Sequence, residues 1–128
     1  MSRALILPLI LILTSPSEAA TFEQLWGARV RRAPEGGVAS VYSDPQPTAS
    51  GERFRPHAKD PAHWTCAHKT EPFDSWLRVT YRGRSIECRV NDRGPYVRGR
   101  VVDLTPPAMK QLGCDGLCRG VVIERIVR

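Results

Sequence analysis

The chain has 128 residues, with nineteen lysines and arginines against thirteen aspartates and glutamates, and a formal net charge of +6. This length allows one domain of ordinary size. This excess of positive charge favours an anionic partner, although the arginines are also consistent with an ordinary solvated surface. Because no helix-turn-helix, zinc-finger or RNA-binding signature occurs, we expect a cell-wall polymer or a membrane surface as partner, and no nucleic acid.

The N-terminal segment, residues 1–19, has the pattern of a signal peptide. A cationic start precedes an apolar run of about ten residues, which is too short for a bilayer because about twenty are needed to span it. Ser17 and Ala19 supply the small residues before a cleavage site, so we expect cleavage after Ala19, with Ala20 as a near alternative. No cysteine follows for lipid attachment. The expectation is an exported protein, periplasmic or secreted, without a membrane anchor.

The first part of the mature chain is poorly patterned. Residues 20–36 are expected to form a flexible lead-in or a short helix. Residues 38–42 predict a first strand, which is closed by the turn-rich residues 43–47. Residues 53–64 contain two prolines and two histidines without a clean period. That pattern favours an irregular surface excursion that shapes a cleft.

Residues 77–81 and 85–90 predict a β-hairpin, with its turn at residues 82–84. The second strand runs into a polar loop, after which Val101 and Val102 begin another apolar run.

Asp92 and Asp103 lie at the two strand ends that this polar loop connects. Because the loop contains turn-forming glycines and a proline, we expect it to bring the two carboxylates toward each other. The same window holds several arginines, namely Arg89, Arg93, Arg98 and Arg100. Such neighbours keep one carboxylate ionised while a drier site keeps another protonated.

One convincing helix follows. Thr105 is a candidate N-cap, the prolines suit the first turn of a helix over residues 106–112, and Gly113 ends it. Residues 121–127 predict the last strand. Several short strands, one short helix and no long repeat predict a small all-β barrel or sandwich.

The four cysteines all follow the expected cleavage site, and an even number in an oxidising compartment predicts two disulfides. Three pairings are possible. We favour Cys114 with Cys118 across a tight loop, which leaves Cys66 with Cys88. Zinc is the alternative, but only one pair is closely spaced, so no metal is expected.

Five short motifs occur in order: GVASVY at 37–42, TASGE at 48–52, AHKT at 67–70, VNDRGP at 90–95 and VDLT at 102–105. Together they resemble the motif series of the rare lipoprotein A (RlpA) family, and the rare string NDRGP makes the signal specific. The resemblance covers residues 37–128. It implies a mainly β fold, a six-stranded double-psi β-barrel with one or two short helices, related to expansins and family 45 glycoside hydrolases.

The resemblance also implies an activity. Studied relatives are endolytic lytic transglycosylases that cut peptidoglycan between N-acetylmuramic acid and N-acetylglucosamine, and some prefer strands stripped of stem peptides. A protonated carboxylic acid donates to the glycosidic oxygen, and the muramic 6-hydroxyl then attacks internally to leave a 1,6-anhydro end. The expected enzyme acts on peptidoglycan as a monomer, without metal or cofactor.

The functional residues of the family fall on Glu52, His68, Asp92 and Asp103. Asp103 is the predicted acid because the related barrel enzymes use an aspartate at the corresponding strand end. Glu52, in a loop of the kind where catalytic groups are found, is its rival. His68 would orient a carboxylate or bind sugar.

Substrate binding is assigned to an aromatic and basic set whose cations would hold the anionic glycan: Tyr42, Lys69, Arg93 and Tyr96.

Each catalytic candidate also has a purely structural interpretation. Asp92 is a turn-stabilising side chain in that interpretation, Asp103 caps the helix with Thr105, His68 is a satisfied, partly buried histidine, and Glu52 is a solvated loop charge.

Trp64 and Trp76 either stack on sugar rings or pack inside the domain.

The sequence departs from the family pattern at Arg55, where many relatives carry an acidic residue, and the stretch from Glu52 to His68 is longer than usual. A non-catalytic, expansin-like module that binds wall polysaccharide is therefore the alternative function. A hydrolase that uses Asp92 and Asp103 as a carboxylate pair is a third possibility.

Overall fold

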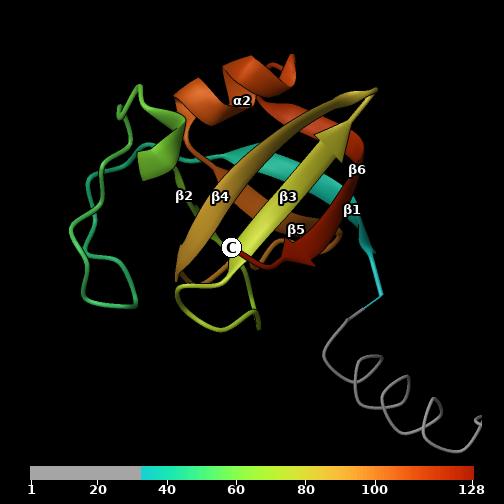
Figure 1. Cartoon of the computed structure of the whole chain (residues 1–128). Coiled ribbons are helices and arrows are strands. Elements are labelled where there is room, and N and C mark those ends of the chain that lie inside the picture. Colours follow the sequence, from blue (N-terminus) through green and yellow to red (C-terminus); the bar gives the residue numbers. More distant parts are fainter. Residues whose placement is uncertain (1–32) are drawn as a thin grey trace, which may run out of the picture. The chain divides into compact units, whose positions relative to one another are not determined.

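The computed structural model describes residues 33–128. The expected signal peptide, and the lead-in up to residue 32, lie outside the described residues. Six strands close into a barrel in the order β1-β5-β2-β4-β3-β6 (Figure 1). The elements are β1 (Glu35–Val41), η1 (Pro61–His63), β2 (Thr65–Ala67), β3 (Trp76–Tyr81), β4 (Arg84–Asp92), β5 (Arg100–Leu104), α2 (Pro106–Leu112) and β6 (Leu117–Ile126). The predicted mainly β, six-stranded barrel is confirmed.

The shortest strand, β2, decides how the two strand-end aspartates meet. It runs parallel to β4 and antiparallel to β5, so it separates the two strands that the sequence joins through the polar loop. Its last residue, Ala67, pairs with Asp92 on one side and with Asp103 on the other. The two aspartates therefore flank a single residue of the sheet, on a strand that the sequence pattern does not predict.

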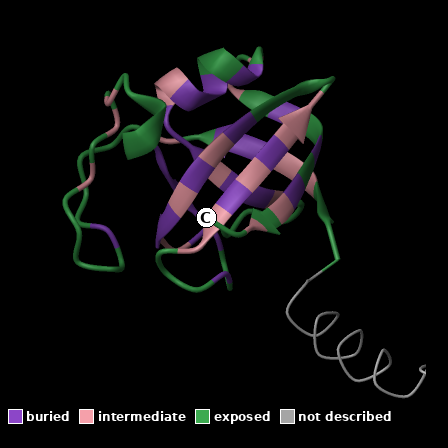
Figure 2. Cartoon of the chain, in the orientation of Figure 1, coloured by how far each residue is buried: buried purple, intermediate pink, exposed green. Residues whose placement is uncertain are grey.

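Side chains alternate between the barrel interior and its surface along β3 and β4 (Figure 2). This alternation is the strand period that the sequence showed over residues 77–90. The interior is filled largely by branched aliphatic side chains from β3, β4, β5 and β6, among them Leu77, Val79, Val90, Val102, Leu104 and Val121, and β1 contributes Ala39. The helix α2 covers one end of the barrel (Figure 1), where Ala108, Met109 and Leu112 are buried.

The first strand begins at Glu35, earlier than the predicted residue 38. Gly36 and Gly37 pair with Val122 and Val121 of β6, so the strand extends through both glycines. A Cβ atom on Gly37 would lie 2.5 Å from Val101 Cγ1. Glycine is therefore required at that position by close packing rather than by a turn.

The helix α2 matches its predicted bounds, with prolines in its first turn and Gly113 in the left-handed conformation at its C-cap. Thr105 occupies the N-cap position, but its hydroxyl makes no capping hydrogen bond. Asp103 lies within β5 and does not act as a cap.

Two disulfides form with the favoured pairing, Cys66 with Cys88 and Cys114 with Cys118. The first links β2 to β4 inside the barrel, where both cysteines are fully buried. The second closes the loop between α2 and β6. Two disulfides indicate an extracytoplasmic location. Within residues 33–128, no helix is long and apolar enough to cross a membrane.

Candidate functional site

A pocket of about 190 Å³ lies where β4 and β5 flank Ala67. We call it the aspartate pocket. Its lining combines both strand-end carboxylates with two aromatic rings and one arginine: Tyr42, Asp44, Gln46, Phe54, Ala67, Asp92, Arg93 and Asp103. Four of the residues predicted to act on or bind substrate, Tyr42, Asp92, Arg93 and Asp103, therefore come together.

Asp103 is the carboxyl group of this pocket whose proton affinity is raised. Burial raises its pKa above the ordinary value for an aspartate, a hydrogen bond from Ser40 and the charge of Arg100 oppose that rise, and the charge of Asp92 adds to it. Ser40 Oγ donates to Asp103 Oδ1 from the neighbouring strand β1. Asp103 thus combines a fixed orientation with a raised pKa, the two properties of a general acid.

Asp92 is held in place by backbone groups. Its Oδ1 accepts hydrogen bonds from the N–H of Ala49 at 2.9 Å and of Arg93 at 2.8 Å. These bonds tie the loop that precedes Glu52 to the end of β4. Asp92 therefore fills the turn-stabilising role that the sequence offered as an alternative, and it also places a negative charge next to Asp103.

Tyr42 and Phe54 form the aromatic wall of the aspartate pocket. Their rings are stacked with centroids 4.5 Å apart. Burial raises the pKa of the Tyr42 phenol, and the charges of Asp92 and Asp103 raise it further, so the hydroxyl stays protonated. Sequence reasoning missed Phe54, although an aromatic residue in an otherwise polar loop was a usable signal.

Glu52 lies in a second pocket and is tightly paired. Arg89 donates to both of its carboxylate oxygens, Nη1 to Oε2 at 2.8 Å and Nη2 to Oε1 at 2.5 Å. The pairing with Arg89 lowers the pKa of Glu52, and Asn91 and Arg55 lower it by smaller amounts. Together these effects outweigh partial burial, which raises the pKa. An ionised carboxylate held in this way is poorly suited to donate a proton.

His68 is buried and does not line the aspartate pocket. Its Nδ1 accepts the backbone N–H groups of Thr70 and Glu71, at 3.1 and 3.0 Å. The proton of the neutral ring therefore lies on Nε2, which donates to Glu35 Oε2 at 2.8 Å. The ring orients a carboxylate, as the sequence suggested, but that carboxylate belongs to β1 and not to the aspartate pocket.

Replacing His68 with alanine is expected to destabilise the domain by about 2 kcal/mol, because the backbone N–H groups of Thr70 and Glu71 lose the buried Nδ1 atom as their acceptor. His68→Asn is the matched control, since its amide oxygen can occupy the Nδ1 position and keep those bonds. Urea unfolding of the three proteins measures the effect. Equal losses in both variants would show that the bonds to Nδ1 contribute little.

The other residues predicted to bind substrate differ in how far their side chains are already engaged by contacts within the protein. Arg93 Nη1 donates to the carbonyls of His68 and Glu71, and its guanidinium lies 3.9 Å from the centre of the Phe73 ring. Lys69 Nζ donates to the carbonyl of Arg100 at 3.0 Å. Tyr96 is 77% exposed. It remains the freest candidate for contact with a ligand.

Tyr96 and Asp103 both approach Gly94 in the loop between β4 and β5. A Cβ atom on Gly94 would lie 3.7 Å from the Tyr96 ring and 3.8 Å from Asp103 Oδ2. Tyr96 therefore stands beside the aspartate pocket.

Trp64 and Trp76 both make contacts within the protein. Trp64 is buried, and its Nε1 donates to the carbonyl of Ala58 at 2.9 Å. The Trp76 ring is covered by the Arg128 guanidinium, 3.9 Å from its centre. Within the described part of the chain, no group of three histidine, cysteine, aspartate or glutamate side chains is arranged to hold a metal ion.

Comparison with known proteins identifies relatives of this domain. The model of a double-psi β-barrel family described as lytic transglycolase matches residues 35–123. The endolytic peptidoglycan transglycosylase RlpA of Yersinia pestis is 47% identical over 81 residues, 59% of this chain and 21% of that protein. A protein of a Nostoc species that also bears the RlpA name is 46% identical over 97 residues, 70% of this chain and 24% of that protein. The chain thus spans about a quarter of the length of these curated relatives.

Among solved structures, the Streptomyces papain inhibitor superposes with a TM-score of 0.60. It is 20% identical, and the match covers 76% of this chain and 97% of the inhibitor. At that identity the likeness concerns the fold alone. The family match and the RlpA relatives together show that this chain belongs to the RlpA-like family of double-psi β-barrel lytic transglycosylase domains.

Proposed function

We propose that this chain is an exported lytic transglycosylase that cleaves peptidoglycan glycan strands endolytically between N-acetylmuramic acid and N-acetylglucosamine. The observation that carries the proposal is Asp103, whose pKa is raised by burial and by the charge of Asp92, which lines the same pocket. The RlpA relatives, named endolytic peptidoglycan transglycosylases, supply the substrate. The two disulfides support export to the periplasm or the medium.

The reaction needs one proton donor that later takes the proton back. Protonated Asp103 donates to the glycosidic oxygen as the bond from that oxygen to C1 of the muramic sugar breaks. Positive charge then builds on the sugar ring, and the negative charge of Asp92 stabilises it. The muramic 6-hydroxyl attacks C1 and returns its proton to Asp103. The products are a 1,6-anhydro end and a free N-acetylglucosamine hydroxyl, and no water is consumed.

The aromatic and basic residues around the pocket hold the strand in this scheme. Tyr42 and Phe54 present a stacked aromatic wall on one side of the aspartates. Tyr96, exposed next to Gly94, offers a second ring face for a sugar. Arg93 lines the pocket and adds the positive charge that an anionic glycan requires.

The test is mass spectrometry of fragments released from purified peptidoglycan by disulfide-intact protein. Native strands and strands stripped of stem peptides are digested in parallel. The proposal predicts soluble fragments with 1,6-anhydro ends. Reducing ends would instead identify a hydrolase. Binding to insoluble peptidoglycan without any release would identify the expansin-like binding module.

Replacing Ser40 with alanine is expected to shift the alkaline limb of the pH–rate profile to higher pH. Burial raises the pKa of Asp103, and the Ser40 hydrogen bond opposes that rise, so its removal lets Asp103 stay protonated to higher pH. Rates of fragment release across a pH series measure the shift. Ser85→Ala, at an exposed serine that interacts with Thr80, is the control. An alkaline limb that moved to lower pH would contradict the role of Asp103 as the acid.

A further inference from the structure

A pocket of about 380 Å³ lies between α2, the start of β4 and the chain around η1. We call it the cation pocket, and its lining is Lys59, Trp64, Arg84, Pro107, Lys110 and Gln111. It shares no lining residue with the aspartate pocket. Arg84 begins β4 and Asp92 ends it, so about 25 Å of strand separates these two residues. A ligand of the cation pocket is therefore distinct from a glycan bond held at the aspartates.

Three cations and no acid line the cation pocket. Lys59, Arg84 and Lys110 are all exposed. Within residues 33–128, the side chains of these three residues make no ion pair and no hydrogen bond. By contrast, Arg125 pairs with the buried Glu71. Because like charges around one pocket repel each other, the binding of an anion there relieves that repulsion.

The acids that lie close to these cations in the sequence do not neutralise them. Asp60 Oδ1 accepts the N–H of Ala62 at 2.9 Å and so caps η1. Glu87 pairs with Arg128 at 3.0 Å. Asp115 lines a neighbouring pocket and makes no ion pair in the described part of the chain. The positive charge of the cation pocket therefore remains available to a ligand.

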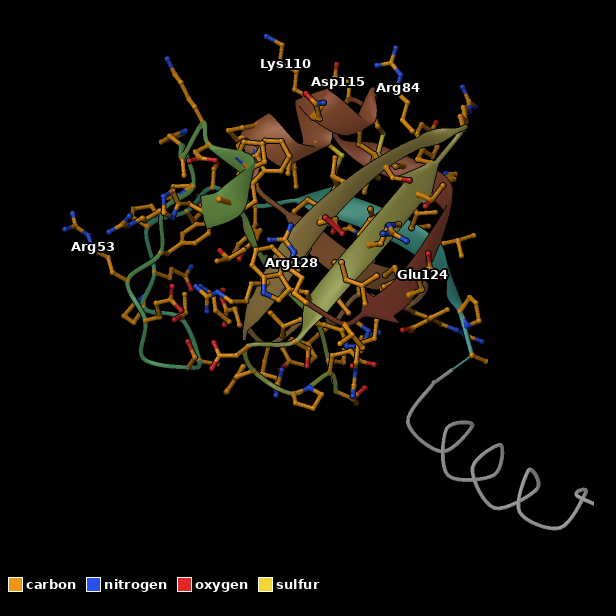
Figure 3. All side chains as sticks on the ribbon, in the orientation of Figure 1. Arg53, Arg84, Lys110, Asp115, Glu124 and Arg128 are labelled. Carbon is orange, nitrogen blue, oxygen red and sulfur yellow. A yellow bond between two sulfur atoms is a disulfide. The ribbon has the colours of Figure 1, made fainter. Side chains whose placement is uncertain are left out.

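The fold gives the cations defined positions. Arg84 and Lys110 project from the end of the barrel that α2 covers (Figure 3). The Arg84 side chain lies against Gly113, the C-cap of α2, where an added Cβ atom would lie 2.9 Å from Arg84 Nη1. Trp64 is buried and its Nε1 donates to the carbonyl of Ala58, so its ring is a fixed part of the lining. The pocket thus combines solvent-facing cations with a rigid base.

We propose that the cation pocket binds a phosphate group of an anionic ligand, with Arg84 and Lys110 as its principal counter-ions. Arginine and lysine both bind phosphate oxygens through charge-assisted hydrogen bonds, and the amide of Gln111 supplies a further donor. A phosphate monoester carries about two negative charges near neutral pH, whereas a carboxylate carries only one, so phosphate matches several cations better.

The pocket is also larger than a single phosphate group, so it has room for the alcohol to which the phosphate is esterified. Two sources present this chemistry outside the cytoplasm. One is the headgroup of an anionic phospholipid, and the other is a soluble glycerol phosphate. Neither depends on the proposed lyase reaction, because the cation pocket lies apart from the aspartates.

The first arm of the experiment is an NMR titration of the disulfide-intact protein with glycerol 3-phosphate at constant ionic strength. Sodium acetate is the comparison anion. The second arm measures cosedimentation with phosphatidylcholine vesicles that contain or lack phosphatidylglycerol. Both arms compare the wild type with Arg84→Ala, Lys110→Ala and the control Arg119→Ala. Arg119 is exposed on β6 and does not line the cation pocket, so its removal changes the net charge equally.

Glycerol 3-phosphate is expected to shift the amides around the cation pocket with a dissociation constant on the order of 1 mM, as for a few exposed charge-assisted hydrogen bonds. Arg84→Ala and Lys110→Ala are each expected to weaken binding about fivefold, the usual effect of one cation near an anionic surface. Arg119→Ala is expected to have little effect. Thermal unfolding checks that each variant keeps the fold, and Lys110→Glu, which leaves the contact of Arg84 with Gly113 intact, is expected to weaken binding further.

The two arms distinguish the sources. Sedimentation that requires phosphatidylglycerol and is weakened by Lys110→Ala assigns the site to a lipid headgroup, whereas binding of glycerol 3-phosphate alone assigns it to a soluble phosphate. Three results would overturn the site. They are equal binding of acetate and glycerol 3-phosphate, equal weakening by Arg119→Ala and Lys110→Ala, and the absence of binding in both arms.

Discussion

Replacing Asp103 with asparagine is expected to lower the rate of glycan cleavage by about 10²- to 10⁴-fold while the barrel stays folded. Asparagine has nearly the same shape as aspartic acid and can still accept the hydrogen bond from Ser40. It cannot give a proton to the glycosidic oxygen or take one from the muramic hydroxyl. The measurement is the initial rate of release of 1,6-anhydro fragments from purified peptidoglycan.

Glu52→Gln is the matched comparison, because Glu52 is the other carboxyl that the sequence offered as acid. Arg89 holds this carboxylate ionised, so it has no proton to give at neutral pH. We therefore expect a smaller loss of rate from Glu52→Gln than from Asp103→Asn. A loss as large as that of Asp103→Asn would contradict the assignment of the acid.

Asp103→Asn also has an expected signature in stability that does not depend on substrate. Burial makes the pKa of Asp103 higher in the folded chain than in the unfolded chain. The ionised group therefore destabilises the fold at pH values above the folded pKa, and this effect disappears below the ordinary pKa of an aspartate. The variant is expected to melt at a higher temperature than the wild type near pH 7 and at a similar temperature near pH 3. A lower melting temperature at both pH values would indicate damage to the fold instead.

The meeting of Asp92 and Asp103 was predictable because both residues end apolar runs and a loop rich in turn residues connects them. The strand pairing that brings them together was not predictable. The three residues of β2 are too few to show a strand period, yet this strand lies between β4 and β5 and places Ala67 between the carboxylates. In a barrel with crossed parallel strands, pairing is decided by contacts far apart in the sequence.

The difference between local sequence signals and contacts between distant residues also explains which other features could be predicted. The helix over residues 106–112 was predicted to the residue, because prolines at its start and Gly113 at its end are local signals. The pairing of Glu52 with Arg89 joins residues 37 positions apart and has no local signal. Whether Glu52 or Asp103 carries the raised pKa depends on that pairing, so the sequence alone left the two as rivals.

Removing the Cys66–Cys88 disulfide is expected to have the largest effect on stability of the substitutions considered. The bond joins β2 to β4 across a separation of 22 residues. Because it restricts the unfolded chain, it contributes about 3 kcal/mol to the free energy of unfolding. For a domain of this size, Cys66→Ala with Cys88→Ala is expected to lower the melting temperature by about 15 °C. Circular dichroism during heating measures the change.

The second disulfide provides the control. Cys114 and Cys118 are separated by only 4 residues, so the same entropic argument gives about 2 kcal/mol for their bond. The double alanine variant of this pair is therefore expected to lose less stability than the Cys66 and Cys88 variant. A greater loss from the short loop would contradict the argument that the constraint on the unfolded chain dominates. Because small domains are stable by only about 5–15 kcal/mol, a loss of about 3 kcal/mol is a large fraction of the stability of the fold. The barrel is therefore expected to be more stable in an oxidising compartment, where the bond persists.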